Sequence, residues 1–249
     1  MWNGVRDIAK AVVKKPLNAL GLDLIRFNPV RSSLSNFMWI SSFDINTVID
    51  IGANTGQFAM RIHAIVPNAS IFSFEPLEES FKQLQTNLGS LPKFRAFHWA
   101  LGDSNTTEAI HRNEFAPCSS LLPMTEVHKK AFPHTVHETR EIVEVRRLDD
   151  VVADLCLQDN ILVKIDVQGY EDKVILGGER LIGRAKLIVV EVSFQTLYER
   201  QPLFDEIYRA LRSKGFAFIG HLNQLSSPLD GSVLQADAIF LRESSADQD

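Results

Sequence analysis

Acidic side chains stand beside short apolar segments of this 249-residue sequence, and one of them opens a glycine-containing turn. Asp50 precedes the turn Gly52-Ala53-Asn54-Thr55-Gly56, while Glu75 and Asp166 each end an apolar segment. A charge inside an apolar strand is costly, so we expect these carboxylates at strand ends, where a ligand can reach them. There they can bind a cation, accept hydrogen bonds from hydroxyls, or accept a proton.

The turn after Asp50 has the residue types of a cofactor-binding loop. Gly52 lets the backbone approach a ligand, with Ala53 beside it. Asn54 tolerates a left-handed conformation, and Gly56 permits close helix packing. Glu75 follows about twenty residues later, where an acid accepts hydrogen bonds from ribose hydroxyls. The spacing therefore predicts a site for a cofactor that contains a nucleoside.

Asp50 discriminates between two such cofactors. A carboxylate at the loop would repel the pyrophosphate of a nicotinamide dinucleotide. S-adenosylmethionine has no phosphate and carries an ammonium and a sulfonium, so the loop favours it as the cofactor. The plainer alternative is that Asp50 only caps a helix and Glu75 is a solvated strand end.

The segment that follows Trp99 is expected to hold the adenine. Ala100 and Leu101 can cover the base, while Asp103 or backbone groups can bond its exocyclic amine. A simple Gly-Asp turn explains Asp103 equally well.

A second group of acids supplies the candidate catalytic residues. Lys164 and Asp166 lie two apart in a strand and so share a face, which an apolar strand tolerates when they are paired or at its end. Asp166 is therefore expected beside the reactive methyl group, where it accepts the hydroxyl proton or orients the oxygen. Glu171 in the next turn and Glu191 at the end of a later strand are further candidates, and a histidine of residues 103–159 is a rival base.

These residues require an α/β fold. From residue 46 the sequence alternates apolar strands with helical patterns, which is typical of a mostly parallel sheet covered on both faces. Pro76 is expected to open one helix and Gly89 to end it. The last two strands have no room for a crossover helix, so they form an antiparallel hairpin. Seven strands are predicted, at Thr47–Ile51, Ser70–Phe74, Phe94–Leu101, Ile161–Asp166, Leu187–Val192, Phe216–Ile219 and Ala236–Leu241.

Three regions follow from this pattern. Residues 1–45 form an N-terminal helical extension, residues 46–243 form the cofactor-binding domain, and residues 244–249 form a polar tail. Within the domain, residues 103–159 are an insertion that covers the substrate. Its alternating stretches, Glu108–Arg112 and Arg140–Arg146, are expected to pair as a hairpin, with a helix at Leu148–Leu155.

Composition narrows the partners. The formal net charge of -5 argues against gripping nucleic acid, and two cysteines are too few for a disulfide framework. A cytoplasmic protein is expected, with no metal site predicted. Residues 5–15 form a basic amphipathic helix, which packs on the domain or docks weakly on the anionic inner face of a membrane. The oligomeric state stays open.

Five segments in order carry a family resemblance: Asp50-Ile-Gly-Ala-Asn-Thr-Gly-Gln-Phe, Phe74-Glu-Pro, Ala100-Leu-Gly, Arg147-Leu-Asp-Asp and Lys164-Ile-Asp-Val-Gln-Gly-Tyr-Glu171. Together they resemble the FkbM family of S-adenosylmethionine-dependent methyltransferases. The resemblance implies a class I methyltransferase (Rossmann-like) fold and O-methylation of a hydroxyl on a carbohydrate, such as a surface glycan or its precursor, or on a sugar-like natural product.

The resemblance also implies residue roles. The first loop and Glu75 would bind the donor, and Asp166, Gly169 and Glu171 would form the acidic active-site signature. Gln168 departs from the pattern, because the family usually has Glu there. An NAD(P)-dependent oxidoreductase and a non-catalytic donor-binding module remain the alternatives.

Overall fold

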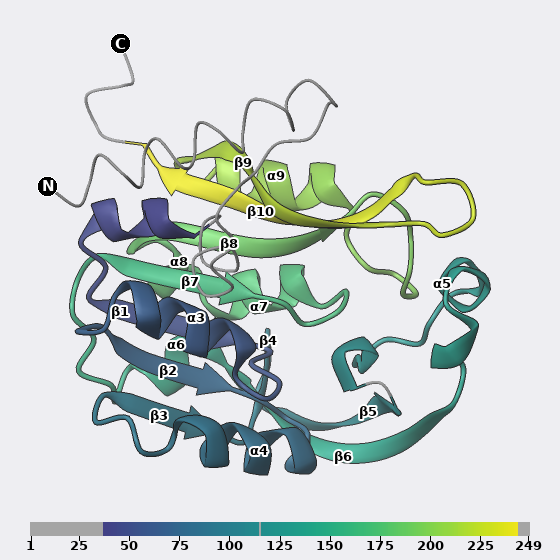
Figure 1. The fold of residues 1–249 in the computed structure, drawn as a ribbon, viewed down its shortest axis with the longest axis horizontal. Coiled ribbons are helices and arrows are strands. Elements are labelled where there is room, and N and C mark those ends of the chain that lie inside the picture. The colour runs from purple at the N-terminus through teal and green to yellow at the C-terminus, as the bar shows by residue number, and fades with distance from the viewer. Residues whose placement is uncertain (1–36, 115, 244–249) are drawn as a thin grey trace, which may run out of the picture. The chain divides into compact units, whose positions relative to one another are not determined.

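The computed structural model describes residues 37–114 and 116–243. A seven-stranded sheet runs through this part (Figure 1). Its order is β3-β2-β1-β7-β8-β10-β9. The strands are β1 (Thr47–Ile51), β2 (Ser70–Phe74), β3 (Phe94–Phe97), β7 (Ile161–Ile165), β8 (Ala185–Ser193), β9 (Phe216–Ser226) and β10 (Val233–Arg242).

Neighbouring strands from β3 to β8 pair in parallel, and β10 pairs antiparallel with both β8 and β9. This confirms the predicted mostly parallel sheet and its antiparallel hairpin. The β1 and β7 side chains are buried throughout, as expected for central strands covered on both faces. Asp50 pairs in register with Ser73 of β2 and Lys164 of β7, which brings these polar side chains together in the sheet.

Helices cover both faces of the sheet. On one face, Ile40, Ile62 and Leu84 belong to one apolar cluster with the sheet, and on the other face Val174 and Ile207 belong to a second. The helices of the first face are η1 (Met38–Phe43), α3 (Gln57–Ile65) and α4 (Glu78–Leu88), and those of the second are α6 (Leu148–Val152), α7 (Glu171–Gly177), α8 (Glu179–Ile182) and α9 (Phe204–Arg212).

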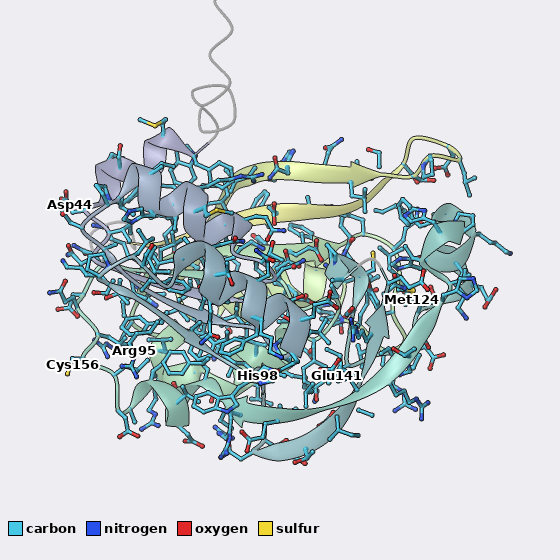
Figure 2. The ribbon with its side chains drawn as sticks, turned by 60° about the horizontal axis from the view of Figure 1, so that its bottom comes forward. Asp44, Arg95, His98, Met124, Glu141 and Cys156 are labelled. Carbon is cyan, nitrogen blue, oxygen red and sulfur yellow. The ribbon has the colours of Figure 1, made fainter. Side chains whose placement is uncertain are left out.

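The predicted strand Phe94–Leu101 is wrong, because it is two strands in different sheets. β3 ends at Phe97, and β4 (Ala100–Gly102) pairs with β6 (Glu138–Arg147) in a three-stranded sheet of order β4-β6-β5. Between them, Trp99 stacks on Phe97, and His98, labelled in Figure 2, stacks on Phe81 of α4. An apolar run does not reveal which sheet supplies the partner strand.

The inserted segment contains the predicted hairpin. β5 (Thr106–Asn113) pairs antiparallel with β6, with His111 opposite Arg140. Between these strands lie η2 (Ala116–Cys118), α5 (Glu126–Ala131) and η3 (Pro133–Thr135). The helix expected at Leu148–Leu155 is shorter, ending at Val152.

Two further predictions concern segment ends. Helix α4 begins at Glu78, two residues after Pro76, because Leu77 is still extended and acts as its N-cap. The predicted amphipathic helix at residues 5–15 and the polar tail at 244–249 lie outside the described residues. Within the described part, no helix is both long and apolar enough to cross a membrane.

Candidate active site

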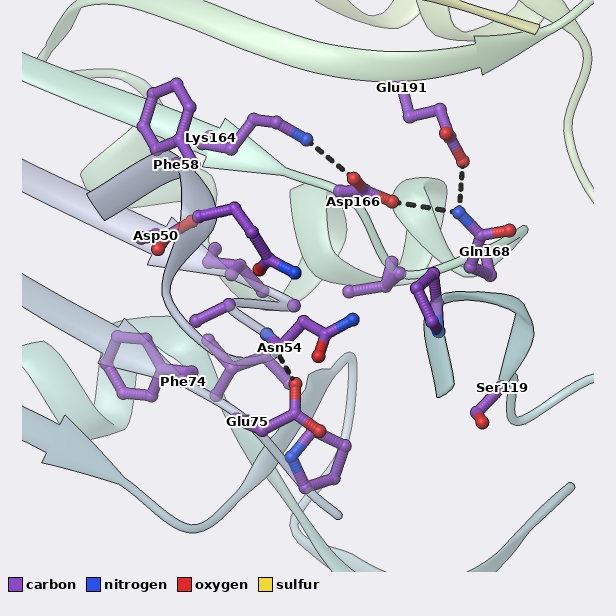
Figure 3. A pocket seen from close by; sticks show the side chains of 18 of the residues that line it. Asp50, Asn54, Phe58, Phe74, Glu75, Ser119, Lys164, Asp166, Gln168 and Glu191 are labelled. Atoms are coloured by element: carbon purple, nitrogen blue, oxygen red, sulfur yellow. Dashed lines mark hydrogen bonds and ion pairs between the residues drawn. The ribbon is translucent and has the colours of Figure 1, made fainter. Parts of the chain in front are cut away.

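A pocket of about 300 Å³ opens at the carboxyl ends of β1, β2 and β7 (Figure 3). Nine of the predicted site residues line it: Asp50, Gly52, Ala53, Asn54, Glu75, Ala100, Leu101, Asp166 and Glu191. Ala116, Pro117, Ser119 and Leu121 of the inserted segment also line it, so this segment forms part of the wall. The topology therefore brings together residues that lie more than 140 positions apart in the sequence.

The turn after β1 has the backbone that the sequence predicted, but Gly52 has a different neighbour. Gly52 and Asn54 both have positive φ, at 75° and 49°. A Cβ on Gly52 would lie 1.8 Å from the carbonyl oxygen of Asp166. The glycine therefore allows the loop after β7 to pack against this turn. Gly56 lies outside the pocket lining, and a Cβ there would meet the Leu88 side chain of α4, as expected for a helix-packing glycine.

Asp50 is buried within the sheet at the base of the pocket, 1% exposed. Its carboxylate accepts a hydrogen bond of 3.2 Å from Ser73 Oγ. Burial raises the pKa of Asp50 to about 6, although the charge of Lys164 and the Ser73 hydrogen bond act in the opposite direction. Asp50 thus presents a carboxylate that a cationic ligand would help to keep ionised.

Glu75 holds the two neighbouring turns together. Its Oε2 accepts a hydrogen bond of 2.8 Å from the backbone N–H of Asn54, and its Oε1 accepts one of 2.9 Å from Leu77 N–H. Burial raises the pKa of Glu75 to about 7 despite these two donors. A carboxylate has about four acceptor positions, so both oxygens retain capacity for a ligand hydroxyl.

Lys164 is the cation at the centre of the site, with a side chain 8% exposed. Its Nζ lies 2.9 Å from Asp166 Oδ2 and 3.5 Å from Asp237 Oδ1. The predicted pairing of Lys164 with Asp166 is thus present, and Asp237 is a second carboxylate beside the same ammonium. Burial alone would lower the pKa of Lys164, but the neighbouring carboxylates, Asp166 foremost, outweigh it and the pKa is raised.

Gln168 bridges the two carboxylates that end β7 and β8. Its Nε2 donates to Asp166 Oδ1 at 2.9 Å and to Glu191 Oε2 at 2.6 Å, as Figure 3 shows. Its Oε1 accepts a hydrogen bond of 2.9 Å from the hydroxyl of Tyr198, which is fully buried. A glutamate at this position would place a third carboxylate between the other two.

Glu191 receives a second hydrogen bond on the same oxygen, from Gln235 Nε2 at 2.8 Å. Burial raises the pKa of Glu191 well above its usual range, and the Asp166 and Glu171 carboxylates add to the effect. Gln168 thus joins Asp166 and Glu191 by hydrogen bonds. Asp166 is also paired with the Lys164 ammonium, whereas Glu191 also accepts from the Gln235 amide.

Besides Gly56, two predicted residues lie outside the pocket lining. Glu171 lies beneath the loop after β7, where its carboxylate accepts hydrogen bonds from the N–H groups of Val167 and Gly169. Burial raises the pKa of Glu171 to about 7. Asp103 pairs with Lys173 of α7 at 3.0 Å. None of the histidines in the described part of the chain lines the pocket, so the suggested histidine bases are not placed to act there.

The sequence reasoning missed several residues of the wall, among them Asp237, Phe58, Arg61, Tyr170 and Asn223. Asp237 had the same signal as Lys164, an isolated charge in an apolar strand. Phe58 and Arg61 gave no signal, because such residues on an expected helix normally pack in the core or face water. Tyr170 and Asn223 lie in expected turns, where their types indicate no particular role.

The charge of the lining suits a cation. Five carboxylates face two cations, namely Asp50, Glu75, Asp166, Glu191 and Asp237 against Arg61 and Lys164. An ammonium and a sulfonium fit this excess of carboxylates, whereas a pyrophosphate does not. The residues present therefore fit S-adenosylmethionine, which when bound supplies an electrophilic methyl group. Within residues 37–114 and 116–243, no three or more His, Cys, Asp or Glu side chains are arranged to hold a metal ion.

The strand order, with one antiparallel strand inserted next to the outer edge, and a ligand pocket at the carboxyl ends of the central strands define a class I methyltransferase fold. The family described as "Methyltransferase FkbM domain" matches residues 50–218. The chain belongs to this family. Residues 50–218 are thus a methyltransferase domain whose donor is S-adenosylmethionine, as predicted, and the family match is against the dinucleotide alternative.

Several curated proteins are similar. The 2-O-methyltransferase NoeI of Sinorhizobium fredii is 31% identical over 160 residues, covering 62% of this chain and 66% of that protein, slightly less than two thirds of its length. The 31-O-demethyl-FK506 methyltransferase FkbM of Streptomyces tacrolimicus is 26% identical over 205 residues, covering 72% of this chain and 76% of that protein. The structure of methyltransferase FkbM from Methylobacillus flagellatus KT has a TM-score of 0.49 at 13% identity, covering 80% of this chain and 44% of that one.

Proposed function

We propose that the protein transfers the methyl group of S-adenosylmethionine to a hydroxyl of a carbohydrate, such as a surface glycan or its precursor, or of a sugar-like natural product. The observation that carries this proposal is the pair of carboxylates, Asp166 and Glu191, on the wall of the donor pocket. A hydroxyl must lose its proton as it is methylated, and a nearby carboxylate can accept it. The names of two relatives, a 2-O-methyltransferase and an O-demethyl-FK506 methyltransferase, support oxygen as the methylated atom.

Donor and acceptor must be held in line and shielded from water. Ile110, Ala116 and Leu121 of the inserted segment line the pocket and pack with Ala100 in one apolar cluster, so the segment supplies an apolar part of the wall. Such positioning can supply a large part of the acceleration without any further chemistry from the protein. We therefore assign the insertion a role as a substrate cover.

The test is transfer of a labelled methyl group to three acceptor pools: cell-surface saccharides with their nucleotide- or lipid-linked precursors, small phenols, and proteins. Label in the saccharide pool, located on a hydroxyl by mass spectrometry, is the expected result. Label only in phenols or proteins would overturn the carbohydrate proposal.

Two alternatives predict different results in simple binding experiments. A donor-binding module without activity would bind S-adenosylhomocysteine by calorimetry and label none of the pools. An oxidoreductase would bind NAD in preference to S-adenosylhomocysteine. We expect S-adenosylhomocysteine to bind and NAD to compete poorly, because the excess of carboxylates in the lining repels the pyrophosphate of NAD.

A further inference from the structure

Asp166 and Glu191 are both placed to act as the base, but the contacts of their oxygens differ. We propose that Glu191, held in position by Gln168, accepts the proton of the acceptor hydroxyl, while Asp166 remains paired with Lys164. The proposal rests on the proposed function, because it assigns the proton in that reaction. It reverses the order of the two acids expected from the sequence.

Both oxygens of Asp166 already have a donor. Oδ2 lies 2.9 Å from the Lys164 ammonium, and Oδ1 accepts the Gln168 amide at 2.9 Å. The ion pair and the amide hydrogen bond therefore occupy both oxygens of Asp166 with donors of the protein. Asp166 is thus placed to hold the Lys164 ammonium in the site.

Glu191 has one occupied oxygen and one free oxygen. Oε2 accepts both amide bonds, from Gln168 at 2.6 Å and from Gln235 at 2.8 Å. Within the part of the chain that the structure describes, Oε1 takes no hydrogen bond from the protein, and Glu191 lines the pocket. Oε1 is thus the atom to which a hydroxyl can give its proton.

The surroundings of Glu191 favour proton uptake. Burial comes first, followed by the charge of Asp166 after β7 and that of Glu171 in α7; Asp237 in β10 acts in the same direction, and Lys164 opposes them. The Tyr198 phenol and the Cys118 thiol also lie within its electrostatic reach. Burial and like charge both favour the neutral form of a carboxyl group.

Gln168 is a positioning residue. The Tyr198 hydroxyl donates to its Oε1, so its Nε2 faces the two carboxylates and can donate one hydrogen to each. This amide fixes Glu191 Oε2 and leaves Oε1 toward the pocket. It also separates two like charges without itself carrying a charge.

The acceptor oxygen forms a bond to the methyl carbon while the bond from that carbon to sulfur breaks, and S-adenosylhomocysteine is the neutral product. The hydroxyl proton moves to Glu191 Oε1 and is later released to water. Help from a general base is typically worth about 10²–10⁴-fold in rate.

The first experiment measures kcat against pH for the full-length enzyme with an acceptor from the transfer assay. The wild-type rate should fall on the acid side. Glu191→Gln should lower the plateau about 10²–10⁴-fold and abolish this fall, with the Kd for S-adenosylhomocysteine unchanged within about twofold. Asp166→Asn, which likewise replaces a carboxylate by an amide of nearly the same size, should keep the fall in kcat at low pH. The opposite assignment, with the fall kept in Glu191→Gln and lost in Asp166→Asn, would overturn the proposal.

The positioning role of Gln168 has its own signature. Gln168→Leu removes a hydrogen bond that stabilises the ionised Glu191, so the fall in kcat should move to higher pH. A lower rate with the fall at its wild-type pH would show a merely structural role and contradict the assignment of Gln168.

The second experiment needs no acceptor. Carboxyl ¹³C NMR of the ligand-free protein, with Glu191 assigned through Glu191→Gln, should show Glu191 titrating at higher pH than exposed glutamates, and higher still in Gln168→Leu. Titration together with the exposed glutamates would refute the proton-acceptor role. Because this readout is independent of any carbohydrate, failure to label the saccharide pool overturns only the proposed function.

Discussion

The two halves of the pocket satisfy their carboxylates in different ways. At the end of β2, Glu75 accepts hydrogen bonds from the backbone N–H groups of Asn54 and Leu77. At the ends of β7 and β8, Asp166 and Glu191 accept theirs from side chains, which are Lys164, Gln168 and Gln235. The half around Glu75, which we propose binds the donor (the donor half), thus depends on the path of the backbone. The half around Asp166 and Glu191, which we propose is catalytic (the catalytic half), depends on the identity of each side chain.

Backbone donors and side-chain donors respond differently to substitution. Backbone donors are present whatever side chain a residue carries, so a change at Leu77 leaves its hydrogen bond to Glu75 in place, and the same holds at Asn54 apart from the strain of its positive φ. In the catalytic half, every donor is a long side chain, from Lys164 and Gln168 on either side of Asp166 and from Gln235 on β10, and a change at one position leaves a buried partner unsatisfied. We therefore expect substitutions in the catalytic half to cost more than those in the donor half, apart from the point where the halves touch.

That point is Gly52, and Gly52→Ala should have the largest effect. The new Cβ would collide with the backbone of Asp166, and alanine is strained at a φ of 75°. Strain and overpacking together should lower the free energy of unfolding by about 4 kcal/mol. The measurement is urea denaturation.

Gly56→Ala is the matched control. Its Cβ would meet the ends of the flexible Leu84 and Leu88 side chains, although the φ of 93° is similarly strained. The loss of stability should be smaller, about 2 kcal/mol. Equal losses of unfolding free energy in Gly52→Ala and Gly56→Ala would mean that the contact between Gly52 and the Asp166 backbone does not contribute to the effect.

The next effect is that of Lys164→Met, which removes the cation of the catalytic half. Asp166 and Asp237 would be left without their shared partner, and breaking a buried pair in this way costs about 3 kcal/mol. Part of the loss should be recovered at pH 5, because the charge of Lys164 opposes the raised pKa of Asp50 and Glu191, and both carboxylates protonate more readily without it. Lys186→Met on β8, whose ammonium binds the Phe43 carbonyl, is the control and should show no such recovery. A pH-independent loss in Lys164→Met would contradict the charge argument.

The same contrast decides what the sequence could predict. The ends of β1 and β2, the turn after β1 and the Lys164–Asp166 pair all follow from spacings of a few residues, and the structure has them. The break between β3 and β4 was not predictable, since an apolar run does not name its partner strand. Gln168 reaches Tyr198 30 residues away, and Glu191 reaches Gln235 44 residues away. No local pattern encodes such contacts, because they arise only when distant strands meet.

The Arg147-Leu-Asp-Asp segment contains a residue whose role depends on a distant part of the chain. Asp149, within the segment that resembles the family, is buried and accepts hydrogen bonds from the N–H groups of Arg180 and Leu181 at the start of α8. It stabilises the first turn of that helix. The sequence identified the residue but not its structural purpose.

In the donor half, Glu75→Gln should weaken binding of S-adenosylhomocysteine. An amide has one acceptor oxygen, for which the N–H groups of Asn54 and Leu77 would compete, so a ribose hydroxyl of the donor would lose its acceptor at a cost of about 1–3 kcal/mol. We expect the Kd measured by calorimetry to rise about 10- to 100-fold. Glu78→Gln, three residues further on the exposed side of α4, should leave the Kd unchanged. An unchanged Kd in Glu75→Gln would place the donor elsewhere in the pocket.

The smallest expected effect is the pH dependence of the donor half, in which stability and affinity move in opposite directions. Burial raises the pKa of Asp50 to about 6 and that of Glu75 to about 7, above the values of the unfolded chain. The native protein therefore holds protons that the unfolded chain has released, and the stability of the ligand-free protein should fall as the pH rises from about 4 to about 7. Binding of cationic S-adenosylmethionine favours the ionised carboxylates, so its affinity should rise about tenfold from pH 5 to pH 7. Calorimetry at these two values, with Asp50→Asn as the control that should flatten the dependence, separates this effect from the catalytic half. An affinity that is independent of pH in the wild-type protein would mean that neither carboxylate senses the donor's charge.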